Sequence, residues 1–161
     1  MIPLDIWKII FNKLDFKSQL SIISLCTYFK KYLFITDLYN INRKYLNLLT
    51  NDILKYKIFM NTQKLNTDNN RKITDVSFMK SLKVLCICGY YCGINQYGIQ
   101  GLELNELDIM NNNKIYNVSF MKSLKILNVS GVLHIIGQSG IQELELNELV
   151  EKKLKQCFNF F

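Results

Sequence analysis

The chain has 161 residues, of which 49% are hydrophobic, and a net charge of +7. This length suits one ordinary domain or two small packed elements, and no apolar run reaches the length of a membrane span, so we expect no membrane partner. The five cysteines are odd in number and unevenly spaced, which argues against a secreted disulfide framework. The first residues also lack the features of a signal peptide, and we expect a cytoplasmic or nuclear protein.

The positive charge is concentrated in the first part of the chain. Residues 1–72 carry twelve Lys and Arg against five Asp and Glu, whereas residues 73–161 carry eight of each. A basic surface attracts nucleic acid, but no recognition motif with an arginine and aromatic pattern accompanies it. A solvated, lysine-rich helical face explains the charge, and we do not expect nucleic acid to be the partner.

Residues 2–33 favour two short amphipathic helices. Pro3 suits the start of the first helix, where the missing N–H of a proline costs nothing. Ser18 is a candidate N-cap for the second helix. The apolar positions recur at helical spacing, with Ile6, Ile10 and Leu14 in the first helix and Ile22, Leu25, Cys26, Phe29 and Leu33 in the second.

The order of residues in this segment resembles the F-box motif, which runs L-P-x-E/D, an I-F pair, a leucine and a later V-C-x-x-W/F. The matching residues are Ile2-Pro3-Leu4-Asp5, Ile10-Phe11, Leu14, Leu20 and Leu25-Cys26-Thr27-Tyr28-Phe29. The chain departs from the usual residues at three positions, where one apolar residue replaces another: Ile2, Leu25 and Phe29. The resemblance implies docking onto the Skp-type adaptor of a cullin–RING ubiquitin ligase. It also implies that some residues of the motif face the adaptor and that others form the core of the motif. The residues that take one of these two roles are Ile2, Pro3, Ile6, Ile10, Phe11 and Leu14.

Residues 35–62 are expected to connect the N-terminal helices, over residues 1–34, to the rest of the chain. This segment contains a helical stripe that we expect to be buried against the first repeat, formed by Leu46, Leu49, Ile53 and Tyr56. Residues 66–72 are polar and turn-rich, and they lie where the repeats begin.

A direct repeat dominates the remaining sequence. Residues 73–107 return without a gap at 115–149, and about two-thirds of the positions are identical. A shorter L-x-x-L-x-L unit recurs within each copy, and its leucines stand at Leu85, Leu107, Leu127 and Leu149. Their spacing falls within the roughly 20–29 residues of leucine-rich repeats. The expected fold class is therefore an α+β or α/β solenoid, in which a short helical element precedes a small leucine-rich-repeat horseshoe with a parallel sheet over residues 63–161.

Alternation along each strand decides which side chains face the shared interior. The inner positions are Leu82, Leu85, Ile87, Leu104, Leu107, Ile109, Leu124, Leu127 and Val129, and Val76, Phe78, Val118 and Phe120 close the convex side. The opposite, concave face is the expected binding surface for a target protein. Its residues are Cys86, Cys88, Glu106, Asp108, Met110, Asn128, Ser130 and Glu148. Glu106, Asp108 and Glu148 give this face an acidic patch, which fits a basic or small apolar segment.

We expect no metal site, no cofactor and no enzyme activity. Cys86, Cys88 and Cys92 have C-x-C-x3-C spacing, not the paired C-x2-C spacing of zinc ribbons. His134 takes the position of Cys92 in the second copy, two repeat units (called rungs below) further along the stack. No neighbouring residue types in the sequence make it a catalytic base. The sequence contains neither a nucleophile elbow nor a Walker loop.

After Leu149 the repeat is unfinished, and either Phe158, Phe160 and Phe161 form a makeshift cap or the chain is a shortened member of a longer family.

F-box motifs are known to precede leucine-rich repeats. The composition, rich in Asn, Ile and Lys, is similar to that of such proteins in giant DNA viruses of amoebae or in AT-rich protists. This resemblance implies a monomeric, non-catalytic substrate adaptor of an SCF-type ubiquitin ligase, which in a virus would act in the host cytoplasm. The alternative is a plain interaction module whose N-terminal helices only cap the solenoid.

Overall fold

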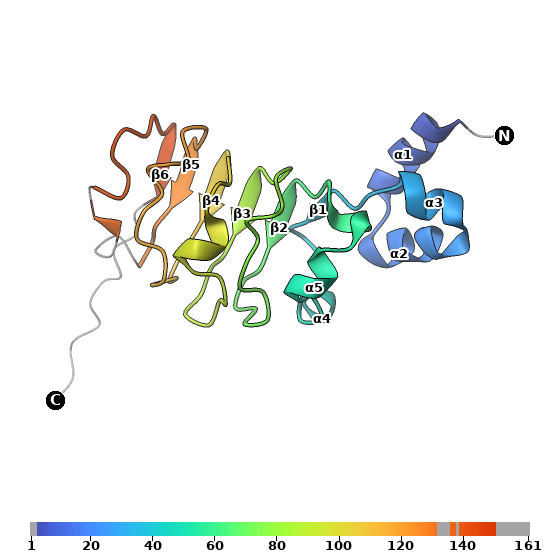
Figure 1. The fold of residues 1–161 in the computed structure, drawn as a ribbon, viewed down its shortest axis with the longest axis horizontal. Coiled ribbons are helices and arrows are strands. Elements are labelled where there is room, and N and C mark those ends of the chain that lie inside the picture. The colour runs from blue at the N-terminus through green and yellow to red at the C-terminus, as the bar shows by residue number, and fades with distance from the viewer. Residues whose placement is uncertain (1–2, 132–135, 138, 151–161) are drawn as a thin grey trace.

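The computed structural model describes residues 3–131, 136–137 and 139–150. Within these residues, six short strands form one parallel sheet in which the strands follow the order of the sequence. Figure 1 shows the first three helices at one end of this row of strands and the last strand at the other end. The solenoid-like stack with a parallel sheet is therefore confirmed.

The elements are short throughout. The α-helices are α1 (Leu4–Lys13), α2 (Phe16–Leu25), α3 (Thr27–Tyr32), α4 (Arg43–Leu46) and α5 (Asn51–Leu54), and the 3-10 helices are η1 (Lys57–Phe59) and η2 (Gln96–Ile99). The strands are β1 (Asp37–Leu38), β2 (Lys64–Asn66), β3 (Val84–Cys86), β4 (Glu106–Asp108), β5 (Ile126–Asn128) and β6 (Glu148–Val150). None of the described helices has both the length and the apolar character needed to cross a membrane.

One leucine from each strand lies in a single row across the sheet. The strand register pairs neighbours in the order Leu38, Leu65, Leu85, Leu107, Leu127 and Leu149. The first five are at most 1% exposed, whereas Leu149 on the edge strand β6 is 37% exposed. A single rung cannot bury its own leucine, so the stability of each strand depends on the next rung.

The expected interior of the stack is confirmed. All nine inner positions, from Leu82 to Val129, are at most 1% exposed. On the other side of the interior, Val76 and Val118 are fully buried, and Phe78 and Phe120 are partly buried against the same core. The expected cap formed by Phe158, Phe160 and Phe161 lies outside the described residues.

Buried asparagines hold the turns that follow the strands. The Asn112 side chain is 1% exposed, and its Nδ2 donates to the carbonyl oxygens of Ile87 at 2.9 Å and Ile94 at 3.3 Å. Its Oδ1 accepts the backbone N–H of Lys114 at 3.0 Å. Asn70 repeats this arrangement with carbonyls of the preceding rung. Asn112, three residues after the last apolar position of its L-x-x-L-x-L unit, thus satisfies backbone groups that would otherwise be buried without partners.

The segment over residues 35–62 contains a strand that the sequence does not predict. Strand β1 has only two residues and pairs in parallel with β2. The segment also contains the short helices α4, α5 and η1. Within the expected helical stripe, Leu46 and Leu49 are buried, whereas Tyr56 is 65% exposed.

The second N-terminal helix differs from the expectation in its start and in its continuity. Asp15, not Ser18, is the N-cap of α2, and its carboxylate accepts the backbone N–H groups of Lys17 and Ser18. The prediction for Ser18 is therefore wrong, because the acidic residue directly before the helix already binds the free N–H groups of the first turn. Cys26 has an extended backbone and divides the expected single helix into α2 and α3.

Candidate functional site

Helix α1 is apolar on two sides. On its inner side Phe11 is 1% exposed, and the ring of Trp7 packs edge-on against Phe29 with centroids 4.9 Å apart. Its outer side, called here the outer face of α1, carries three isoleucines: Ile6, Ile9 and Ile10, which are 45%, 59% and 39% exposed. A surface helix is normally apolar on one side only. The outer face of α1 is therefore a candidate docking surface.

The positions assigned by the F-box resemblance divide into two groups. Phe11 lies in the core and Leu14 is half-buried. The exposed positions are Pro3, Ile6 and Ile10. Ile2 lies outside the described residues. Ile9 is not among the predicted positions, although it stands directly before the I-F pair and is the most exposed of the three isoleucines.

The neighbouring helices add apolar surface and positive charge. Three large hydrophobic side chains of α2 and α3 are exposed, Leu20 at 37%, Leu25 at 72% and Tyr28 at 49%. Lys30 and Lys31 lie in the last turn of α3 and are also exposed. Such a combination fits a partner whose surface offers apolar side chains with acidic groups at the rim.

The expected target-binding residues lie on the sheet face opposite the leucine row, called here the open face. The register aligns Lys64, Val84, Glu106, Ile126 and Glu148 in one row, and Asn66, Cys86, Asp108, Asn128 and Val150 in the next. Cys86, Cys88 and Ser130 are buried, Asp108 and Asn128 are half-buried, and Glu106, Met110 and Glu148 are exposed. The expected acidic patch is divided, because Ile126 of β5 separates Glu106 on β4 from Glu148 on β6.

Three strands, β2, β4 and β5, end with a polar turn residue on the open face. Asn66, Asp108 and Asn128 each accept, through Oδ1, the backbone N–H two residues further on, at 2.8, 3.0 and 3.1 Å. These side chains close a tight turn after the strand. On β3 the same register position is occupied by Cys86, whose thiol replaces the amide or carboxylate.

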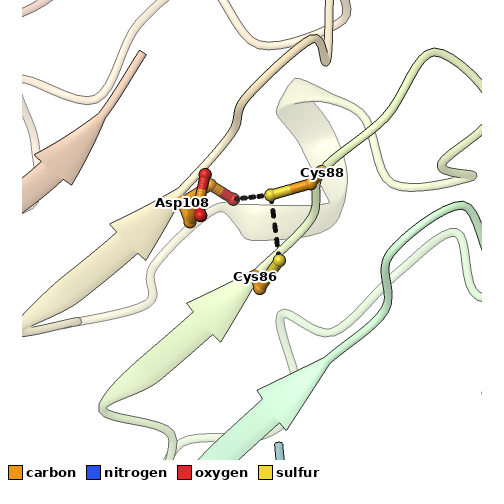
Figure 2. Close-up of side chains that lie close together, drawn as sticks. All are labelled: Cys86, Cys88 and Asp108. Atoms are coloured by element: carbon orange, nitrogen blue, oxygen red, sulfur yellow. Dashed lines mark hydrogen bonds between the residues drawn. The ribbon is translucent and has the colours of Figure 1, made fainter. Parts of the chain in front are cut away.

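Cys86 and Cys88 point toward each other on the open face. Figure 2 shows the two thiols together, with Asp108 beside them. Their Sγ atoms are 2.9 Å apart, and the Sγ of Cys88 is 3.6 Å from the backbone oxygen of Asp108. The hydrogen bond with Cys86 and burial raise the pKa of the Cys88 thiol above its ordinary value. Neither thiol belongs to a disulfide.

The structure separates Cys92 from this pair. Its Sγ lies 3.6 Å from the Oγ1 of Thr67 and 3.7 Å from the Thr67 carbonyl oxygen. Burial raises the pKa of the Cys92 thiol. The C-x-C-x3-C sequence is thus two neighbouring thiols plus a third that contacts a different rung. His134 lies outside the described residues.

Tyr39 belongs to the same region of the open face. It follows β1 and stands one residue after Leu38, which pairs with Leu65. Burial, followed by electrostatic interactions with Cys86, Asp108, Cys88 and Glu106, raises the pKa of Tyr39 to about 12. Tyr39 is not among the predicted residues, because a two-residue strand leaves no repeat signal in the sequence.

No protein-family model matches the chain, and neither a curated protein nor a solved structure matches it. The geometry of the outer face of α1 and of the open face, together with the motif resemblance, therefore carries the functional inference.

Proposed function

We propose that the chain is a non-catalytic substrate-recognition adaptor of a cullin–RING ubiquitin ligase. The N-terminal helices dock onto a Skp-type adaptor, and the repeat array holds a target protein on its open face. The outer face of α1 carries this proposal, because three isoleucines there stay exposed although the opposite side of the helix is already packed. Exposed apolar side chains grouped on one helix face are typical of a protein-binding site.

The division of the motif residues supports the same function. An F-box-like segment needs some of its apolar residues for its own core and others for the adaptor. Phe11 and the Trp7–Phe29 ring pair supply the first kind, and Ile6 and Ile10 supply the second. The helices lie at one end of the row of strands, so a protein bound to them leaves the open face of the central strands accessible (Figure 1).

Direct binding to a purified Skp-type adaptor tests the proposal. We expect Ile10→Glu in the full chain to weaken this binding by at least about 30-fold, the loss that removing an interface hot spot of about 2 kcal/mol produces. Ile9→Glu, at a more exposed position, provides a second variant whose folding is less affected. Calorimetry or surface plasmon resonance gives the affinity, and circular dichroism checks the fold.

Leu48→Glu is the matched control, because Leu48 is 63% exposed and lies just past α4, away from the outer face of α1. It should bind the adaptor as the parent does. If the intact chain binds no Skp-type adaptor, or if both isoleucine variants bind it with unchanged affinity, the proposal is wrong.

A second candidate function is a plain interaction module whose N-terminal helices only cap the stack. The continuity of the core favours it. Phe11 and Ile23 belong to one buried cluster with Leu38 of the first rung, and the ring of Phe16 lies 5.3 Å from that of Tyr45. Removing residues 1–34 would uncover this core and lower solubility under either function. Only the charged substitutions on the outer face of α1 discriminate, because they leave the core intact.

A further inference from the structure

The open face gathers three side chains that carry metal-ligating atoms. Each of Cys86, Cys88 and Asp108 offers one such atom, and the three atoms lie within 4.8 Å of one another. Cys86 ends β3, Cys88 lies two residues further on, and Asp108 ends the adjacent strand β4; Figure 2 shows the three residues close together. The thiols are 5% and 4% exposed, whereas the Asp108 side chain is half-buried and reaches the solvent side of the cluster.

The fold itself does not require thiols at these positions. In the second copy of the repeat, Asn128 and Ser130 take the places of Cys86 and Cys88. There the Asn128 side chain accepts the backbone N–H of Ser130 at 3.1 Å and closes the turn after the strand. The strand register of β3 with its two neighbours recurs at β5, so an asparagine and a serine satisfy the backbone geometry. The two cysteines therefore need another explanation.

We propose that Cys86, Cys88 and Asp108 form a binding site for one thiophilic divalent cation of the zinc class. Two thiolates and one carboxylate are a donor set that zinc accepts, whereas calcium and magnesium prefer oxygen ligands alone. Three protein ligands leave a fourth tetrahedral position for water or for a group of a bound target. The site is separate from the outer face of α1, so it goes beyond adaptor docking.

The distances fit this cation with a small adjustment. Zinc–sulfur bonds of about 2.3 Å at tetrahedral angles hold two thiolates about 3.8 Å apart. The Cys86 and Cys88 Sγ atoms, now 2.9 Å apart, would move apart by about 0.9 Å. Rotation about the Cα–Cβ bond of either cysteine moves its Sγ atom without moving the backbone, and Cys88 lies beyond the last residue of β3.

Titration of the full chain with cadmium and zinc ions tests the site. The protein is reduced with a phosphine, stripped with a chelator and kept without oxygen. Cadmium is expected to produce the ultraviolet charge-transfer band of a cadmium–thiolate bond and to saturate at one ion per chain. Zinc is then expected to remove that band by competition.

The variant Cys86→Asn with Cys88→Ser copies the residues of the second repeat and is therefore expected to fold. It should lose the band. Asp108→Asn keeps an oxygen that can accept the Met110 N–H, and it should weaken binding by about tenfold or more. Cys26→Ser is the control, because Cys26 is an exposed thiol in the break between α2 and α3, and it should bind as the parent does.

Two outcomes would overturn the site. The reduced chain takes up no cadmium, or the double variant keeps the full band, which would place the ion on other residues. In the first case, mass spectrometry after mild oxidation tests whether Cys86 joins Cys88 with the loss of two hydrogen atoms. That result would identify a dithiol and not a metal site.

Discussion

Gly89 lies so close to Asn69 that a Cβ atom on the glycine would overlap the Oδ1 atom of the asparagine. Both residues have a left-handed backbone, with φ of +91° for Gly89 and 52° for Asn69. The same contact recurs in the second copy of the repeat, between Gly131 and Asn111. Each of these glycines therefore lets one rung pass close to the asparagine turn of the rung before it.

Gly89→Ala should destabilise the protein by about 2–4 kcal/mol. About 1–2 kcal/mol comes from placing an L-residue in the left-handed region, and the rest comes from displacing the Asn69 side chain. Urea unfolding followed by circular dichroism measures the change in the free energy of unfolding.

Gly101→Ala separates the two contributions. Gly101 also has a positive φ, of +67°, but a Cβ there would meet only the flexible end of Lys80 at 3.4 Å. This variant should lose only the backbone contribution of about 1–2 kcal/mol. Equal losses for the two variants would show that the close approach of Gly89 to Asn69 does not affect stability.

The leucine row and the interior of the stack are predictable from the sequence because one spacing governs both. A nearly constant step between the leucines brings equivalent positions of parallel strands side by side, and alternation then decides which side chains are buried. Strand β1 cannot be predicted from this spacing, because it has only two residues and its rung lacks the L-x-x-L-x-L pattern. Without β1, the position of Tyr39 on the open face is not predictable.

The two candidate surfaces are predictable only in part. Alternation correctly places Cys86 and Cys88 on one face of the sheet. Asp108 follows Cys86 by the same step that separates Leu85 from Leu107, so the register already pairs Asp108 with Cys86. A search for cysteine and histidine ligands alone passes over this carboxylate. Helical spacing, in turn, does not tell which of two apolar sides of α1 faces the core.

Asn112→Ala should destabilise the protein by about 2–4 kcal/mol. The substitution leaves the buried carbonyls of Ile87 and Ile94 and the N–H of Lys114 without the side chain that binds them. Asn113→Ala is the control in the adjacent position, where the side chain is exposed, and should change stability by less than about 0.5 kcal/mol. Thermal unfolding that is equal for both variants would exclude a role of the buried amide.

Phe11→Ala should destabilise the N-terminal helices by about 3–5 kcal/mol, because it removes a ring that is 1% exposed and leaves a cavity. Ile9→Ala, on the outer face of the same helix, should change the free energy of unfolding by less than about 0.5 kcal/mol. Hydrogen exchange of the amides in α1 and α2 measures both effects locally. Similar protection in the two variants would contradict the assignment of Phe11 to the core and Ile9 to the surface.

Alkaline pH should weaken the protein through Tyr39. The pKa of Tyr39 is raised in the folded state to about 12, so above the ordinary tyrosine value of about 10 the unfolded chain loses this proton first. Deprotonation then stabilises the unfolded state, and the free energy of unfolding falls as the pH rises from about 10 toward 12. The fall attributable to Tyr39 should be on the order of 1 kcal/mol, because partial exposure of the ring screens the charges around it.

Tyr39→Phe removes this proton and should therefore lose less stability than the parent between about pH 10 and pH 12. Urea unfolding across that range measures the difference, and the other tyrosines and the lysines contribute equally to both proteins. Tyr97→Phe, which changes a ring that is 71% exposed, is the matched control and should follow the parent. If Tyr39→Phe and the parent lose stability in parallel, then the pKa of Tyr39 is not raised in the folded protein, and the burial of its phenol is contradicted.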